Sequence, residues 1–184
     1  WRYISTQSIS IVKEAKVKDG ASSYSLHFDH KTTYKNSLGY IVSNQQIRKA
    51  LYKKIKNNSN IKLILKSEVL SFSIKKNISF VNLSNKKTLQ CSLIVAADGR
   101  LSKIRKKAGI SSNIKDFGTA MIVCKMKHER MHNNIAFEFF HYSQTMAILP
   151  LKRNISSVVI TLPSSEANNL LKMNQNNFNK NIIS

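Results

Sequence analysis

The most constraining feature of the chain is an apolar run at residues 92–97 that leads directly into Asp98-Gly99 and a basic segment. Small and β-branched apolar residues in such a run are typical of a strand covered on both faces. Gly99 permits a tight turn, Ser102 is a good N-cap for a helix, and Gly109 would end that helix. The sequence therefore predicts a strand, a turn and a helix start in succession.

This junction has two interpretations. The N–H groups at a helix start favour an anion such as a phosphate, and the carboxylate of Asp98 would accept a hydrogen bond from a ribose hydroxyl. An Asp-Gly pair after an apolar run is also an ordinary turn or hairpin signal. Taken alone, the junction leaves both interpretations open.

Residues 97–105 resemble, over their full length, the D-G-x-x-S-x-x-R fingerprint of class A FAD-dependent monooxygenases. Further segments similar to this family follow in the family's order, at residues 39–51, 117–120, 136–140 and 147–151. The similarity is greatest to the ubiquinone-biosynthesis hydroxylases, which oxidise polyprenylated phenols, and it extends over nearly the whole chain.

The resemblance implies an α/β fold, with α and β elements mixed, related to that of para-hydroxybenzoate hydroxylase. Residues 1–112 would form part of a Rossmann-like FAD-binding layer with inserted antiparallel strands. Residues 113–184 would form the front part of a substrate-binding β-sheet domain. The family's G-x-G-x-x-G unit and its later Gly-Asp motif do not occur among the five glycines, so we expect an internal fragment that binds flavin poorly by itself.

The resemblance also implies FAD as the cofactor and NAD(P)H as a co-substrate. Asp98 and Gly99 would border the ribose and pyrophosphate of the flavin, and Arg105 matches a position associated with nicotinamide phosphates. The helix beside the flavin would carry two further contacts, for which a solvated helix start is an equal alternative. The implied cofactor-binding residues are Asp98, Gly99, Arg100, Ser102, Arg105, Asn44 and Arg48. No catalytic acid or base and no metal ligand is expected.

The formal net charge is +21, from 30 basic and nine acidic residues. Lysine dominates and is scattered, whereas base readout favours clustered arginine, so we do not expect nucleic-acid binding. A basic surface suits peripheral contact with an anionic membrane. Two cysteines and no apolar run of about 18 residues favour a cytoplasmic protein, peripheral on the inner face of the membrane. The resemblance implies a phenolic small-molecule substrate and a multi-enzyme ubiquinone-synthesis complex as partners.

Hydrophobic periodicity predicts a helix from Asn44, capped by Ser43 or Asn44 and stopped at residues 57–60. A second helix should contain Ala167, Leu170 and Leu171. Alternating runs predict strands at residues 61–65, 69–74, 78–83, 88–91, 120–126, 135–141, 146–151 and 157–162, with a turn at residues 19–20.

Two clusters have competing interpretations. Residues 128–132 match the zinc motif H-E-x-x-H, but their surroundings favour a polar loop between strands. Phe137, Phe139, Phe140 and Tyr142 would line an aromatic pocket or belong to the core. Pro150 is expected at a strand edge or bulge.

The resemblance therefore implies a fragment of an FAD-dependent aromatic-ring hydroxylase that uses NAD(P)H and O₂ and acts on a polyprenylated phenol. One alternative is a prenyl-lipid reductase, which shares the Asp-Gly fingerprint. Another is a non-enzymatic basic binding module.

Overall fold

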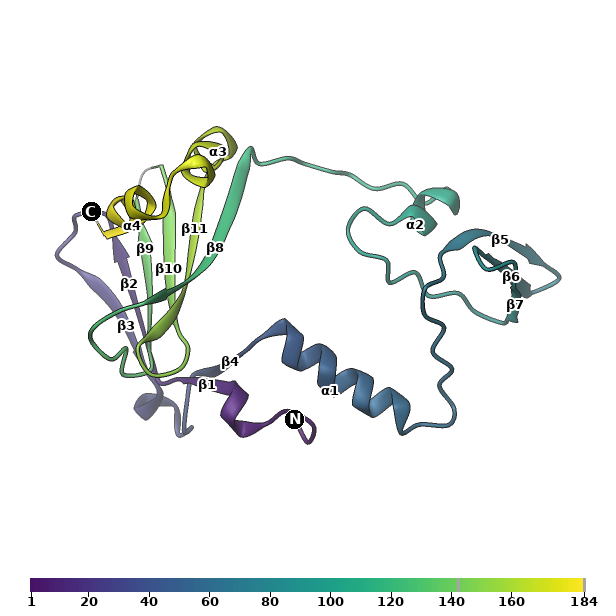
Figure 1. Ribbon diagram of the computed structural model, residues 1–184, viewed down its shortest axis with the longest axis horizontal. Helices are drawn as coiled ribbons and strands as arrows, with labels where there is room; N and C mark the ends of the chain where they lie inside the picture. Colours follow the sequence, from purple (N-terminus) through teal and green to yellow (C-terminus); the bar gives the residue numbers. More distant parts are fainter. Residues whose placement is uncertain (142, 184) are drawn as a thin grey trace. The chain divides into compact units, whose positions relative to one another are not determined.

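The computed structural model describes residues 1–141 and 143–183, and only the backbone of residues 181–183. The chain forms two compact units (Figure 1). The first unit contains Trp1–Asn57 and Asp116–Ser184, and the second unit contains Asn58–Lys115. The assignment of residues 1–112 and 113–184 to a cofactor domain and a substrate domain remains a prediction.

A six-stranded sheet forms the centre of the first unit. Its strands, in sheet order, are β3 (Ser25–Asp29), β2 (Glu14–Asp19), β9 (Ile135–Phe140), β10 (Thr145–Pro150), β11 (Ile155–Pro163) and β8 (Thr119–Lys127). All neighbours are antiparallel except β2 and β9, which are parallel. This parallel pair joins an early strand to a late one, so the sheet depends on contacts between distant parts of the sequence.

The first unit also contains a two-stranded ribbon and several helices. Strands β1 (Ile9–Val12) and β4 (Gly39–Val42) form an antiparallel ribbon, and α1 (Asn44–Lys56) follows β4 directly. The hydroxyl oxygen of Ser43 accepts the backbone N–H of Gln46, which confirms the predicted N-cap. The other helices are α3 (Ser164–Lys172), α4 (Gln175–Ile183) and the short 3₁₀ helices η1 (Thr6–Ser8) and η2 (His30–Thr33).

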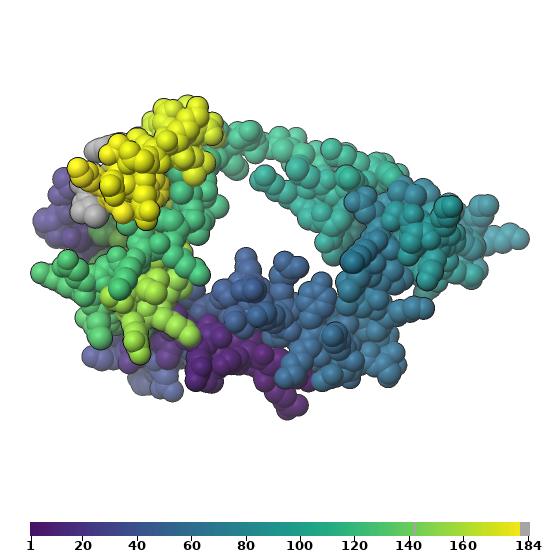
Figure 2. Space-filling model, in the orientation of Figure 1, coloured from purple at the N-terminus to yellow at the C-terminus, as the bar shows by residue number. Residues whose placement is uncertain are grey.

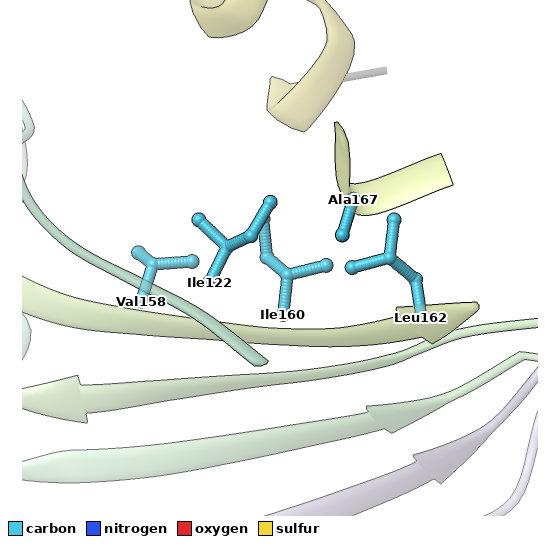
Figure 3. Packing of buried hydrophobic residues seen from close by; sticks show 5 residues of the cluster. All are labelled: Ile122, Val158, Ile160, Leu162 and Ala167. Atoms are coloured by element: carbon cyan, nitrogen blue, oxygen red, sulfur yellow. The ribbon is translucent and has the colours of Figure 1, made fainter. Parts of the chain in front are cut away.

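The core of the first unit lies on one face of the sheet. Every second residue of β11 is buried, and Val158, Ile160 and Leu162 are each at most 3% exposed. Figure 3 shows these side chains and Ile122 of β8 on the same side of the sheet, with Ala167 of α3 beside them. Leu170 of α3 and Phe178 of α4 pack against this cluster. Figure 2 shows both helices, in yellow, at the surface of the first unit. Burial of these side chains is the main stabilising contribution in the first unit.

The second unit contains a small antiparallel meander and a short helix. Strands β5 (Val69–Lys75), β6 (Ile78–Leu83) and β7 (Thr88–Cys91) pair in sequence order, and α2 (Lys103–Lys107) follows the Asp-Gly turn. Gly109 has a φ of +70°, and Ile110 donates its N–H to the carbonyl of Arg105. This is the bonding of a Schellman C-cap, which confirms the predicted helix stop.

Two predicted strands are absent from the second unit. Residues 92–97 are extended but have no strand assignment, and Leu93 and Val95 are 75% and 78% exposed, so the prediction of a buried strand is wrong for this chain. Residues 61–65 have no strand assignment either. A β-strand needs a neighbour for its backbone N–H and C=O groups, and no described residue pairs with these segments.

Residues 128–132 form a loop between β8 and β9, which confirms the prediction of a polar loop. Phe137 and Phe139 stack on one face of β9, with ring centroids 6.0 Å apart. Phe140 falls on the opposite face because strand residues alternate. The predicted aromatic cluster is therefore divided between two faces, and Tyr142 lies outside the described residues.

Pro150 ends β10, which is an interior strand of the sheet, and its side chain is fully buried. The predicted location at a sheet edge or bulge is therefore wrong. An interior position is tolerated because Pro150 is the last residue of the strand, where the sheet hydrogen bonding ends.

Candidate functional site

The Asp-Gly junction of the second unit lies beside two cavities. Gly99, Ser102 and Arg105 line a cavity of about 760 Å³ whose other walls are mostly apolar. Asp98 lines a smaller neighbouring cavity of about 280 Å³. Gly99 has a φ of +91°, a conformation that glycine adopts readily and other residues do not.

Asp98 is held by the start of α2. The Ser102 hydroxyl donates a hydrogen bond to Oδ1 of Asp98, and the backbone N–H of Ile104 donates to Oδ2 over 3.2 Å. The hydrogen bond from Ser102, followed by that from Ile104, lowers the pKa of Asp98 below its ordinary value. Asp98 is therefore ionised at neutral pH. Each of its oxygens keeps a lone pair for a further donor, such as a ribose hydroxyl.

Arg105 lines the larger cavity and has two buried donors without a partner among the described residues. Its Nη1 donates to the carbonyl oxygen of Arg100 over 3.3 Å. Its Nε and Nη2 are buried, and neither has a hydrogen-bond partner within residues 1–141 and 143–183. These two nitrogens form one edge of the guanidinium group, which binds two oxygens of a phosphate or carboxylate at once. A buried donor without a partner is costly, so this edge is suited to an acceptor that the chain does not supply.

The other predicted residues occupy different places. Arg100 is exposed and contributes its backbone carbonyl rather than its side chain. Asn44 and Arg48 belong to α1 in the first unit. Asn44 lines a cavity of about 500 Å³ there, whereas Arg48 is exposed and is not part of that cavity wall.

The cavity of the first unit is formed by three parts of the chain. The β1–β4 ribbon and the start of α1 form one side, and the sheet face opposite the core forms the other. Its polar side chains include four that the sequence did not identify as site residues, namely Ser10, Lys125, Lys152 and Ser157. Alternation along residues 120–126 places Lys125 on the face away from the core. No sequence pattern indicates that the ribbon lies over that face.

The residues of the junction fit an FAD-type ligand. Asp98 offers an acceptor for a sugar hydroxyl, and the free edge of Arg105 offers paired donors for phosphate oxygens. Gly99 leaves open space, since a Cβ built on it would meet nothing within 4 Å. The donors and acceptors therefore match the sugar and phosphate parts of a dinucleotide.

Comparison with known proteins identifies the relatives of this chain. The family described as FAD binding domain matches residues 9–180. Ubiquinone hydroxylase UbiM of Neisseria meningitidis is 36% identical over 92% of this chain and 38% of its own length. Ubiquinone hydroxylase UbiL of Rhodospirillum rubrum is 30% identical over 97% of this chain and 41% of its own length. The chain therefore spans less than half the length of these relatives.

Solved structures show the same fold. PqsL of Pseudomonas aeruginosa in complex with 2-aminobenzoylacetate superposes with a TM-score of 0.73 at 16% identity, over 89% of this chain and 45% of its own. HpxO of Klebsiella pneumoniae complexed with FAD and uric acid superposes with a TM-score of 0.65 at 13% identity, over 85% and 41%. At these identities the likeness supports the fold alone.

No helix among the described residues has the length and apolar character required to cross a bilayer.

The family match covers nearly the whole chain, and the relatives confirm the resemblance to ubiquinone-biosynthesis hydroxylases. The chain belongs to the FAD binding domain family.

Proposed function

We propose that this chain is part of an FAD-dependent aromatic-ring hydroxylase that uses NAD(P)H and O₂ and acts on a polyprenylated phenol. The family membership and the ubiquinone hydroxylases among the relatives support this proposal. FAD, once bound and reduced by NAD(P)H, supplies the oxygen-transfer chemistry. The residues of this chain have the tasks of binding, orienting and shielding.

The observation that carries the proposal is the pair of complementary groups at the Asp-Gly junction. The ionised carboxylate of Asp98 is fixed by Ser102 and Ile104, so its orientation is set before a ligand arrives. The free edge of Arg105 provides two parallel N–H donors that no described residue uses. We assign Asp98 and Gly99 to the sugar-phosphate part of FAD, and Arg105 to a phosphate of FAD or NAD(P)H.

The other implied residues have secondary tasks in this proposal. Ser102 positions Asp98, and Arg100 positions Arg105 through its backbone carbonyl. Asn44 would contact the cofactor from the wall of the first-unit cavity. Arg48 would contribute positive charge near the same helix.

The test uses the longer polypeptide that contains this chain. Asp98→Ala should lower the flavin bound per protein after purification, measured by visible absorbance. Asp19→Ala, which removes an exposed carboxylate at the end of β2, is the matched control and should leave flavin content unchanged. Thermal unfolding of both variants checks that the fold is intact. Equal flavin content in the Asp98→Ala variant and the wild type would contradict the proposed role.

Oxygen dependence separates hydroxylation from the alternative of prenyl-lipid reduction. A hydroxylase consumes O₂ in step with NAD(P)H when a polyprenylated phenol is present, and its product carries an added oxygen. A reductase forms its product equally well without oxygen. Product formation under anaerobic conditions would therefore exclude the proposed reaction.

We further propose that the complete protein is cytoplasmic and associates peripherally with the inner face of the membrane, next to other enzymes of ubiquinone synthesis. The net charge of +21 supports attraction to anionic lipid, at about 1 kcal/mol for each well-placed Lys or Arg. Sedimentation with vesicles tests this. Binding should require anionic lipid and weaken with salt, and equal binding to neutral vesicles would contradict it.

A further inference from the structure

The segment of residues 1–4 and helix α1 carry positive charge and no negative charge. Residues 1–13 and 37–57 contain no Asp or Glu, so every acidic residue of the chain lies elsewhere in the sequence. The basic residues of these two elements are Arg2, Arg48, Lys49, Lys53, Lys54 and Lys56. The charge of this region therefore favours an anionic partner.

The two elements lie side by side in the first unit. Figure 1 shows the start of the chain alongside α1, and Arg2, Tyr3, Leu51 and Lys54 contribute to the wall of a cavity of about 350 Å³ between them. The Nζ atom of Lys53 lies 5.6 Å from the centroid of the Tyr3 ring, which is a cation–π contact. Cationic, aromatic and aliphatic side chains therefore meet in one place.

Several apolar side chains of this region face water. The Trp1 ring packs edge-on against the Tyr40 ring, with centroids 5.4 Å apart, and yet Trp1 is 73% exposed. Leu51 is 57% exposed. We call residues 1–4, Tyr40 and α1 together the α1 surface. Exposed tryptophan and leucine side chains gain free energy when they leave water, so this surface is suited to a partner with apolar groups.

A lipid bilayer matches this combination better than a nucleic acid does. Trp and Tyr are favoured at the level of the lipid headgroups, and lysine is attracted to lipid phosphates. A leucine gains by entering the boundary of the acyl chains. Base readout favours arginine over lysine, and an aliphatic side chain such as Leu51 cannot stack on a base as an aromatic ring does.

We propose that the α1 surface docks onto an anionic lipid bilayer. Trp1, Tyr40 and Leu51 enter the headgroup region, and Lys53 and Lys54 contact lipid phosphates. The proposal rests on the peripheral membrane association in the proposed function, because it identifies which part of the chain makes that contact. Both the charge and the apolar side chains contribute, so binding requires anionic lipid and also depends on Leu51.

The first experiment measures how the charge of the α1 surface affects binding. The longer polypeptide that contains this chain, with its flavin bound, is sedimented with vesicles of phosphatidylcholine, with or without phosphatidylglycerol. Lys53→Gln/Lys54→Gln should weaken binding to the anionic vesicles roughly 25-fold, or about fivefold for each lysine. Lys75→Gln/Lys76→Gln removes the same charge from exposed residues between β5 and β6 and should weaken binding far less.

The second experiment tests insertion of the apolar side chains. Leu51→Ala should weaken binding about tenfold, because fewer apolar atoms leave water. Leu26→Ala is the matched control, since Leu26 is an exposed leucine of β3 in the same unit, and it should bind like the wild type. Thermal unfolding of each variant verifies that it is folded.

Trp1 itself reports on the contact. The difference in fluorescence between the wild type and Trp1→Phe isolates the emission of Trp1, which should move to shorter wavelength when anionic vesicles are added. Inorganic phosphate and a single-stranded RNA oligonucleotide should leave this emission unchanged. A change with RNA would favour nucleic acid as the partner, and a change with phosphate would indicate a site for the free anion. Either result would overturn the proposal.

Two further results would also overturn it. One is equal vesicle binding by Lys53→Gln/Lys54→Gln and the wild type. The other is short-wavelength emission of Trp1 without vesicles, which would mean that another part of the longer polypeptide covers this surface. Hydroxylation of a short-chain phenol in solution is assayed separately. Normal hydroxylation with weakened vesicle binding in the α1 variants supports the assignment, whereas absence of hydroxylation by the wild type contradicts the proposed reaction and leaves the vesicle result to decide this surface.

Discussion

The hydroxyl of Ser102 donates a hydrogen bond to the carboxylate of Asp98. The same hydroxyl oxygen accepts the backbone N–H of Arg105 over 3.0 Å, and Ser102 is only 5% exposed. One buried side chain therefore fixes the predicted ribose acceptor and caps the helix that carries the predicted phosphate donor. The local sequence brings Asp98, Ser102 and Arg105 together, because the hydrogen bonds that join them span only a few residues.

Ser102→Ala should weaken both the cap and the position of Asp98. Loss of an N-cap hydroxyl costs about 1 kcal/mol, and here the Asp98 carboxylate also loses a donor. We expect faster hydrogen exchange at the Arg105 amide in the variant, measured by NMR. Ser102→Thr keeps the hydroxyl and should exchange like the wild type. Unchanged exchange in Ser102→Ala would show that the cap contributes nothing.

The ionisation of Asp98 should make the α2 cap sensitive to acid. The pKa of Asp98 is lower in the folded chain than its ordinary value of 3.8, chiefly because Ser102 donates to the charged form. Its contribution to stability is therefore complete above the unfolded pKa and is lost as the pH falls through the lower, folded pKa. The amide shift of Ile104 should titrate in that acidic range. In Asp98→Asn this titration should disappear, and its persistence would identify another group as its source.

Truncating a side chain of the six-stranded sheet should destabilise the first unit only when that side chain lies on the core face. Val158 is 3% exposed, so Val158→Ala should reduce the free energy of unfolding by roughly 2 kcal/mol. Val123 lies on the opposite face and is 65% exposed, so Val123→Ala should change it by less than about 0.5 kcal/mol. Urea unfolding measures both variants. Equal losses would mean that both faces are covered.

Gly99 and Gly39 form a matched pair for backbone strain. A Cβ built on either residue meets nothing within 4 Å, but only Gly99 has a φ in the left-handed region, at +91°. Gly99→Ala should therefore destabilise the second unit by about 1–2 kcal/mol, whereas Gly39→Ala should be neutral or slightly stabilising. Thermal unfolding followed by NMR distinguishes the units. A neutral Gly99→Ala would show that the turn tolerates a side chain.

Local patterns predicted most of the elements correctly. The helix from Asn44 begins and ends where its apolar spacing and its Ser43 cap indicate. The alternating runs match β5 to β11 within a few residues, but nothing in the sequence indicated α4. These helices and strands can be predicted because they depend on hydrogen bonds and side-chain periodicity within a short segment.

The incorrect predictions concern partners rather than local structure. Residues 92–97 have the composition of a buried strand, yet no described segment pairs with them, and Leu93 remains exposed. A β-strand needs a neighbouring segment for its backbone hydrogen bonds, and the residues of the strand do not specify which segment that is.

The Asp98–Ser102–Arg105 junction and the family can be recognised from the amino-acid sequence alone, because the fingerprint residues and their cap lie within nine consecutive positions, 97–105. Three features depend on the tertiary fold. Strand β2 pairs with β9, Nε and Nη2 of Arg105 are buried without a partner among the described residues, and Ser10 and Lys125 share a cavity. Ser10 and Lys125 are far apart along the chain. Their proximity follows from burial and sheet pairing between distant segments, which no local pattern specifies.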